Sequence, residues 1–156
     1  MKIESPAFKE GGVIPKKHTG EGADVSPALA WSAAPEGTKQ FALICDDPDA
    51  PTPKPWVHWV IYAIPADAKG LAEGIATSAT LDAPKGAMQG RNDFGRTGYA
   101  GPLPPPRHGA HRYCFKLYAL DSALALKPGI DKYALEAAMK GHILAETKLV
   151  GTYERK

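Results

Sequence analysis

The chain has 156 residues, of which 44% are hydrophobic and 23% charged; these ordinary values exclude the disordered, fibrous and membrane-embedded classes. The formal net charge of +2 is too small to indicate a nucleic-acid partner, and no apolar run approaches the roughly 20 residues of a membrane span. We therefore expect one domain over residues 1–156 without integral membrane association, and, because residues 1–6 lack the apolar core of a signal peptide, a cytoplasmic location.

Turns and strands dominate the expected fold. The 16 glycines and 15 prolines are spread between short apolar runs, which predicts many turns and a mostly β protein. In the first half of the chain the apolar runs predict strands over residues 28–32, 40–46 and 56–65. The last of these is apolar on both faces and should be a central strand. Strict alternation places His58 on the face opposite Trp59.

Residues 82–110 show no periodicity and predict a long loop rich in glycine and proline. A loop of this length inside a compact domain is unusual and often functional. Glycines let backbone amides approach a ligand closely, so the loop has the composition of an anion-binding turn. It lacks the Gly-Lys-Ser/Thr sequence of a nucleotide-binding loop.

The last part of the chain predicts a strand over residues 111–120, a helix over 132–139 and a strand over 148–153. Asp131 can cap the helix at its start. Met139, on the narrow apolar stripe of the helix, is interpreted as a core contact rather than a ligand of a metal or cofactor.

Polar side chains gather at the ends of three predicted strands. Asp47 and Asp49 follow the strand over 40–46, His58 lies near the start of the next strand, and His111 opens another strand and shares a face with Tyr113. Antiparallel neighbours bring the end of one strand beside the start of the next. We therefore expect these five side chains to meet at one rim, although taken singly each acid suits a solvated turn and each histidine a core position.

No metal or cofactor site is predicted. His108 and His111 are three residues apart, but they lie in a passage from loop to strand and no third histidine is near, so a catalytic zinc site is not indicated. The sequence also lacks the Gly-x-Ser-x-Gly motif of a serine hydrolase.

The chain resembles the phosphatidylethanolamine-binding protein family in its bacterial and archaeal Raf-kinase-inhibitor-like branch. The resemblance runs over nearly the whole chain and rests on five blocks in the family's order. They are SPALAWSAAPEGTKQFALICDDPDAP (26–51), WVHWVIYAIP (56–65), QGRNDFGRTGYAGPLPPP (89–106), HRYCFKLYALD (111–121) and AMKGHILAETKLVGTYER (138–155).

This resemblance implies an antiparallel β-sandwich with few helices, a homodimer, and a small cavity that accepts phosphate or a phosphorylated head group such as phosphoethanolamine. It also implies that the cavity is formed by eight residues, which match the family's motifs one by one: Asp47, Asp49, Pro51, Trp56, His58, Gly101, His111 and Tyr113.

We expect a non-enzymatic binding protein for a small anionic or zwitterionic ligand. A carboxylate within about 4–6 Å of an imidazole favours its protonated form, so Asp47 and Asp49 should leave His58 or His111 substantially cationic near neutrality, or receive an ammonium group themselves. Two alternatives stay open. One is an inhibitor of a protein kinase or protease acting through the loop at 82–110, and the other is a hydrolase that uses the His/Asp set as acid and base.

Two residues depart from the family's pattern. Arg107 stands where family members commonly carry glycine, which affects the loop conformation and adds charge at the mouth of the cavity. Ala63 stands where asparagine is common, which we interpret as a change in packing.

Overall fold

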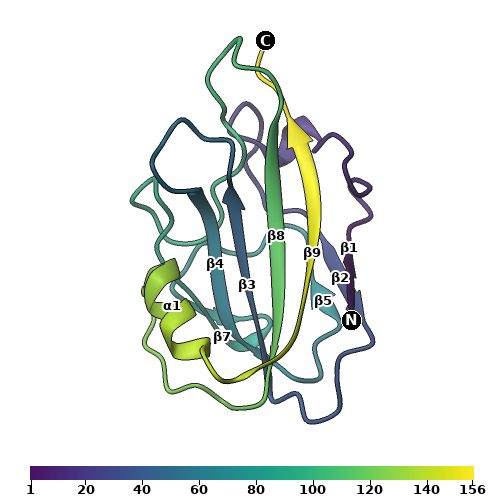
Figure 1. The fold of residues 1–156 in the computed structure, drawn as a ribbon, viewed down its shortest axis with the longest axis vertical. Coiled ribbons are helices and arrows are strands. Elements are labelled where there is room, and N and C mark those ends of the chain that lie inside the picture. The colour runs from purple at the N-terminus through teal and green to yellow at the C-terminus, as the bar shows by residue number, and fades with distance from the viewer.

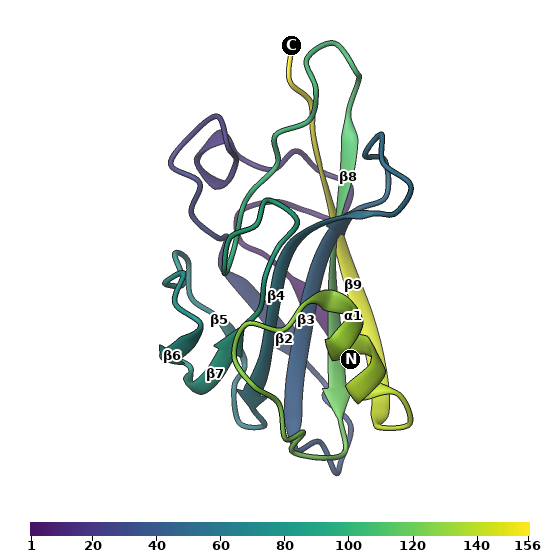
Figure 2. The same cartoon turned by 90° about the vertical axis from the view of Figure 1, so that its left-hand side faces the viewer.

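The computed structural model describes residues 1–156 as two antiparallel sheets packed face to face, with one α-helix on the outer face of the larger sheet (Figure 1, Figure 2). The six-stranded sheet has the order β6-β7-β4-β3-β8-β9, and the three-stranded sheet has the order β1-β2-β5. The strands are β1 (Lys2–Glu4), β2 (Leu29–Ser32), β3 (Gln40–Asp47), β4 (Trp56–Pro65), β5 (Gly70–Leu71), β6 (Thr80–Asp82), β7 (Lys85–Gln89), β8 (His111–Leu120) and β9 (Ile143–Tyr153), and the helices are η1 (Lys16–His18) and α1 (Lys132–Met139). The predicted antiparallel β-sandwich with one α-helix near the C-terminus is confirmed.

The centre of the large sheet is buried on both sides because its strands carry apolar residues on both faces. One face of β3, β4 and β8 packs against the small sheet, with Leu43, Trp59 and Phe115 in this main core. The opposite face packs under α1, where Ile44 and Val60 belong to a second, smaller core. No helix in the structure has the length and apolar character needed to cross a lipid bilayer.

Helix α1 is held at its start and along one face. The Asp131 side chain accepts a hydrogen bond from the Ala134 amide at 2.8 Å, as the sequence predicts for an N-cap. Leu135 and Met139 are buried against the sheet, so Met139 is a core residue as expected.

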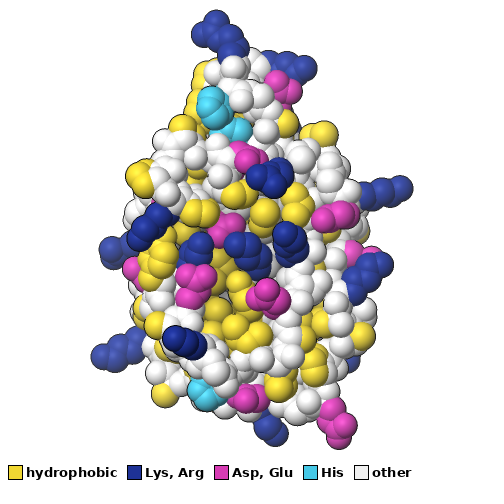
Figure 3. Space-filling view, viewed as in Figure 1, with side chains coloured by type: hydrophobic (Ala, Val, Ile, Leu, Met, Phe, Trp, Pro, Cys, Tyr) yellow, Lys and Arg dark blue, Asp and Glu magenta, His cyan; other side chains and the backbone are white.

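A buried acid also ties α1 to the sheet. Asp46, 1% exposed, accepts hydrogen bonds from Lys132 of α1 at 2.9 Å and from Lys116 of β8 at 3.1 Å. Burial works against the charged Lys132 ammonium, but the hydrogen bond and negative charge of Asp46 outweigh it and raise the pKa of Lys132 above its ordinary value. Figure 3, viewed as in Figure 1, shows basic and acidic side chains gathered across the middle of the molecule.

The prediction of a loop over residues 82–110 is wrong for the first part of this range. Residues 85–89 form β7, which pairs with β4 and β6, and Asp82 ends β6. The sequence Lys-Gly-Ala-Met-Gln has neither alternation nor β-branched residues, so only its pairing with β4 makes it a strand. Strand β9 begins at Ile143, five residues before the predicted start.

The prediction that side chains alternate strictly between the two faces of β4 is also wrong near the start of the strand, because β4 contains a β-bulge there. Trp59 pairs with Cys45 and Val57 pairs with Asp46, so His58 has no partner on β3. An extra residue in one strand shifts the side chains beyond it to the other face. His58 therefore lies on the same side of the sheet as Trp59, where its ring meets Tyr113.

Both departures from the family's pattern adopt left-handed backbone conformations. Ala63 has φ 54° and Arg107 has φ 60°, a region that favours glycine and, among other residues, asparagine. Asparagine at position 63 and glycine at position 107, the usual residues of the family, would thus suit the backbone better. The presence of Ala63 therefore affects backbone conformation as well as packing.

Candidate functional site

A cavity of about 190 Å³ lies where the C-terminal end of β3 meets the starts of β4 and β8. Six of the eight predicted residues line it: Asp47, Pro51, Trp56, His58, His111 and Tyr113. The remaining walls come from Ala50, Thr52, Phe94, Leu103, Pro104 and Pro105, which the sequence analysis did not single out. The apolar groups stand around a small number of buried polar atoms, an arrangement typical of a ligand pocket.

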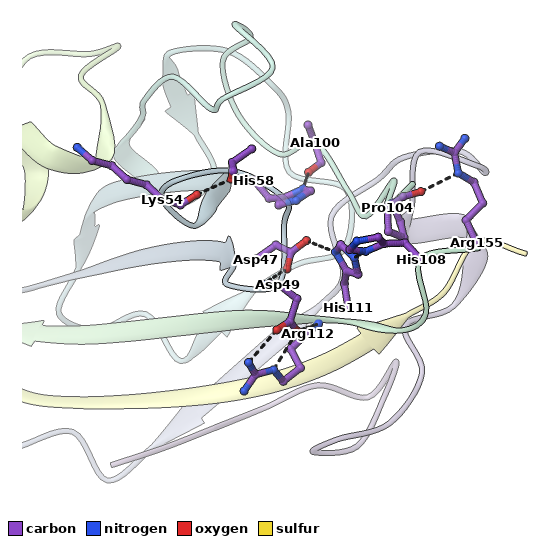
Figure 4. A network of polar contacts seen from close by, with 11 residues as sticks. Asp47, Asp49, Lys54, His58, Ala100, Pro104, His108, His111, Arg112 and Arg155 are labelled. Carbon is purple, nitrogen blue, oxygen red and sulfur yellow. Dashed lines mark hydrogen bonds and ion pairs between the residues drawn. The ribbon is translucent and has the colours of Figure 1, made fainter. Parts of the chain in front are cut away.

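An aspartate orients one of the two cavity histidines. Asp47 Oδ2 lies 2.7 Å from His111 Nδ1, and both side chains are nearly fully buried. Asp47 Oδ1 accepts a second hydrogen bond, from the Asp49 amide at 2.8 Å. Because a carboxylate only accepts, the proton on His111 lies at Nδ1. Figure 4 shows this pair at the centre of a chain of polar contacts that continues to His108.

The surroundings of the second histidine favour its neutral form. His58 Nδ1 lies 2.5 Å from the Ala100 carbonyl, so it donates its proton there and leaves Nε2 as an acceptor. Burial lowers the pKa of His58 below its ordinary value, although the Ala100 hydrogen bond and the negative charge of Asp47 act in the opposite direction. The expectation of a cationic imidazole is therefore wrong for His58, because desolvation outweighs the nearby acid.

The hydroxyl of Tyr113 is buried and has no hydrogen-bond partner. The Tyr113 ring packs edge-on against His58, with centroids 5.1 Å apart, and the residue is 1% exposed. Burial raises the pKa of Tyr113, with a further contribution from Asp47, so the group stays a protonated donor. A buried polar atom without a partner is rare in native structures.

Two predicted residues do not line the cavity. Asp49 accepts hydrogen bonds from Arg112 Nε at 2.9 Å and Nη2 at 2.8 Å, and this contact lowers the pKa of Asp49 to about 2. Asp49 is therefore committed to Arg112 rather than free to receive an ammonium group. The amide of Gly101 donates to Asp24 Oδ1 at 2.7 Å and so points away from the cavity.

Asp24 is a positioning residue that sequence reasoning missed. Its carboxylate fixes the Gly101 amide, and the carbonyl of the preceding residue, Ala100, accepts the proton of His58. The Tyr99 hydroxyl adds a hydrogen bond to the His18 carbonyl at 2.6 Å, so the loop around η1 braces this segment. The sequence around Asp24 resembles an ordinary turn and carries no signal of this role.

Protonation of His58 should make the protein less stable at mildly acidic pH. The folded state binds this proton less well than the unfolded state does, so stability is present above the unfolded pKa near 6.5 and is lost as the pH falls below it. We expect the free energy of unfolding, measured by urea denaturation between pH 8 and 5, to decline by at most about 1.4 kcal/mol per pH unit from this group. The His58→Gln variant should flatten the decline; an unchanged pH profile would contradict the assignment.

Comparisons with known proteins identify the family and support the fold. A sequence model described as phosphatidylethanolamine-binding protein matches residues 4–154. A UPF0098 protein from Methanothermobacter thermautotrophicus is 49% identical over 155 residues, covering 99% of both chains. The crystal structure of Escherichia coli YbcL, described as a new member of the mammalian PEBP family, has a TM-score of 0.92 at 35% identity and covers 99% of this chain and 98% of its own. A putative homologue of the same family from Chlamydia trachomatis has a TM-score of 0.88 at 40% identity, with 99% and 97% coverage.

Proposed function

Because the chain belongs to the phosphatidylethanolamine-binding protein family, we propose that it is a non-enzymatic protein that binds a small phosphate-type oxyanion in the cavity between β3, β4 and β8. The observation that carries this proposal is the buried hydroxyl of Tyr113, which has no partner within the protein. An unsatisfied buried donor costs about 1–3 kcal/mol. An oxyanion that accepts its hydrogen bond removes this cost.

The other groups of the cavity suit a phosphate ester that carries a proton or an ammonium group. Neutral His58 offers an acceptor nitrogen, which can pair with a P–OH group or an ammonium but repels an unprotonated oxygen. Trp56 and Phe94, with ring centroids 5.5 Å apart, supply an apolar wall for the carbon part of a ligand. A zwitterion such as phosphoethanolamine has a group for each of these partners.

The Tyr113→Phe variant tests this function because two effects of opposite sign are expected. Without ligand, removal of the unsatisfied hydroxyl should raise the free energy of unfolding by about 1 kcal/mol. The affinity for inorganic phosphate or phosphoethanolamine, measured by calorimetry, should fall about tenfold, since one hydrogen bond to a charged acceptor is lost. Phosphoethanolamine should be recovered unchanged after incubation.

Tyr118→Phe is the matched control. Tyr118 is also buried in β8, but it belongs to the core under α1, so its hydroxyl does not face the cavity. This variant should bind phosphate as the wild type does. Equal affinities of Tyr113→Phe and the wild type, or hydrolysis of the ester, would refute the proposal.

A further inference from the structure

Both ring nitrogens of His111 are already committed within the protein. Nδ1 faces Asp47 at 2.7 Å, and Nε2 lies 2.6 Å from Nδ1 of His108. The two imidazole rings have centroids 4.8 Å apart and are tilted by 64°. Figure 4 shows His108 beside His111, on the side away from Asp47. An anion that uses His111 must therefore first displace His108 from Nε2.

The contact between the two rings requires a single proton. Because the Asp47 carboxylate keeps a proton on Nδ1 of His111, either Nε2 of His111 or Nδ1 of His108 carries the shared one. The contact can form when the pair is neutral or carries one positive charge. If both facing nitrogens are protonated, neither can accept, and the rings must separate.

His108 is the member of the pair that can move. It is exposed, whereas His111 is 2% exposed and fixed by Asp47. His108 lies between Arg107, with φ 60°, and Gly109, with φ 85°, in the loop that leads from the cavity wall into β8. The charged groups around the pair are Asp47 on β3, Asp49 paired with Arg112, Arg107 itself, and Arg155, which holds the Pro104 carbonyl at 2.8 Å.

We propose that His108 is a second imidazole of the anion site, with the oxyanion inserted between His108 and His111 and accepting one N–H from each ring. This inference rests on the proposed function. The oxyanion replaces one direct ring-to-ring hydrogen bond by two charge-assisted ones, which are stronger than hydrogen bonds between neutral groups. The required second proton comes from solvent or from a tautomer change of His108.

Nitrogen-15 NMR of the histidine side chains during titration with inorganic phosphate tests whether both rings respond to the anion, and the variants below distinguish binding by His108 from its mere displacement. The signals of His108 Nδ1 and His111 Nε2 should move together and saturate at the same phosphate concentration. His142, which pairs with Asp121 at 2.9 Å and lies outside the cavity, serves as the internal control and should not move. A shift of His111 without a shift of His108 would overturn the inference.

Calorimetry with variants gives an independent test. The His108→Ala variant should bind phosphate about tenfold more weakly than the wild type, as expected for one lost hydrogen bond to a charged group, and His142→Ala should bind it equally well. Unchanged or tighter binding by His108→Ala would show that His108 only blocks the site, which overturns the inference while leaving the proposed function intact. Phosphate binding by neither the wild type nor His108→Ala would instead refute the proposed function.

Discussion

Replacement of Asp46 by asparagine should lower the free energy of unfolding by about 3–5 kcal/mol, because it leaves a buried lysine without its charge partner. Asp46 is the shared acceptor of Lys132 and Lys116. The Lys132 side chain is only 9% exposed, whereas that of Lys116 is 34% exposed and can reach water. Urea denaturation at pH 7 would measure the loss, and helix α1 should be the first element to lose protection in hydrogen exchange.

A double variant separates lost charge pairing from lost packing. Lys132→Met removes the buried ammonium, so Asp46→Asn together with Lys132→Met should be more stable than Asp46→Asn alone. Lys116→Met is the matched control on the exposed side and should cost no more than about 1 kcal/mol. If the double variant is as unstable as the sum of the two single variants, the charge-pair explanation is wrong.

Replacement of Gly101 by alanine should damage both stability and the cavity. An added Cβ would stand 2.2 Å from the His18 carbonyl oxygen and 2.8 Å from Asp24 Oδ1, which forces the backbone of one segment to move. Overpacking of this kind costs roughly 1–3 kcal/mol. The shift would also disturb the Ala100 carbonyl that fixes the tautomer of His58. We expect phosphate affinity in calorimetry to fall by at least about tenfold, the equivalent of about 1.4 kcal/mol.

Gly86→Ala provides the control for a general effect of glycine replacement. Gly86 has φ 85° and open space around the added Cβ, so this variant should lose about 1 kcal/mol through backbone strain alone and keep its phosphate affinity. A Gly101→Ala protein that retains both stability and affinity would show that the η1 loop does not brace the cavity.

The sequence predicts the central strands well because they are buried on both faces. The predicted strands 56–65 and 111–120 agree with the observed bounds of β4 and β8, since continuous apolar runs between turn residues leave little choice of structure. The neighbourhood of Asp47, His58, His111 and Tyr113 was also predictable, because the order of antiparallel strands brings their ends together.

Features that depend on partners distant in the chain could not be predicted. Strand β7 forms because the edge of β4 is available for pairing. The ion pair of Asp49 depends on the position of Arg112 on β8. His58 lies on the cavity side only because β4 has one residue more than β3 at the bulge. In the sequence, His108 offers only a three-residue spacing from His111, and only the structure shows the hydrogen bond between their rings.

The bulge in β4 also bears on how the cavity can change during evolution. His58 has no partner on β3. Deletion of this one residue would let Val57 and Trp59 pair with neighbouring residues of β3 as in a regular strand, and no apolar side chain would change faces. Such a deletion would remove the imidazole and also the hydrogen bond that the His58 carbonyl accepts from the Ala100 amide at 3.0 Å, so its cost falls on the loop beside the cavity rather than on the pairing of the sheet.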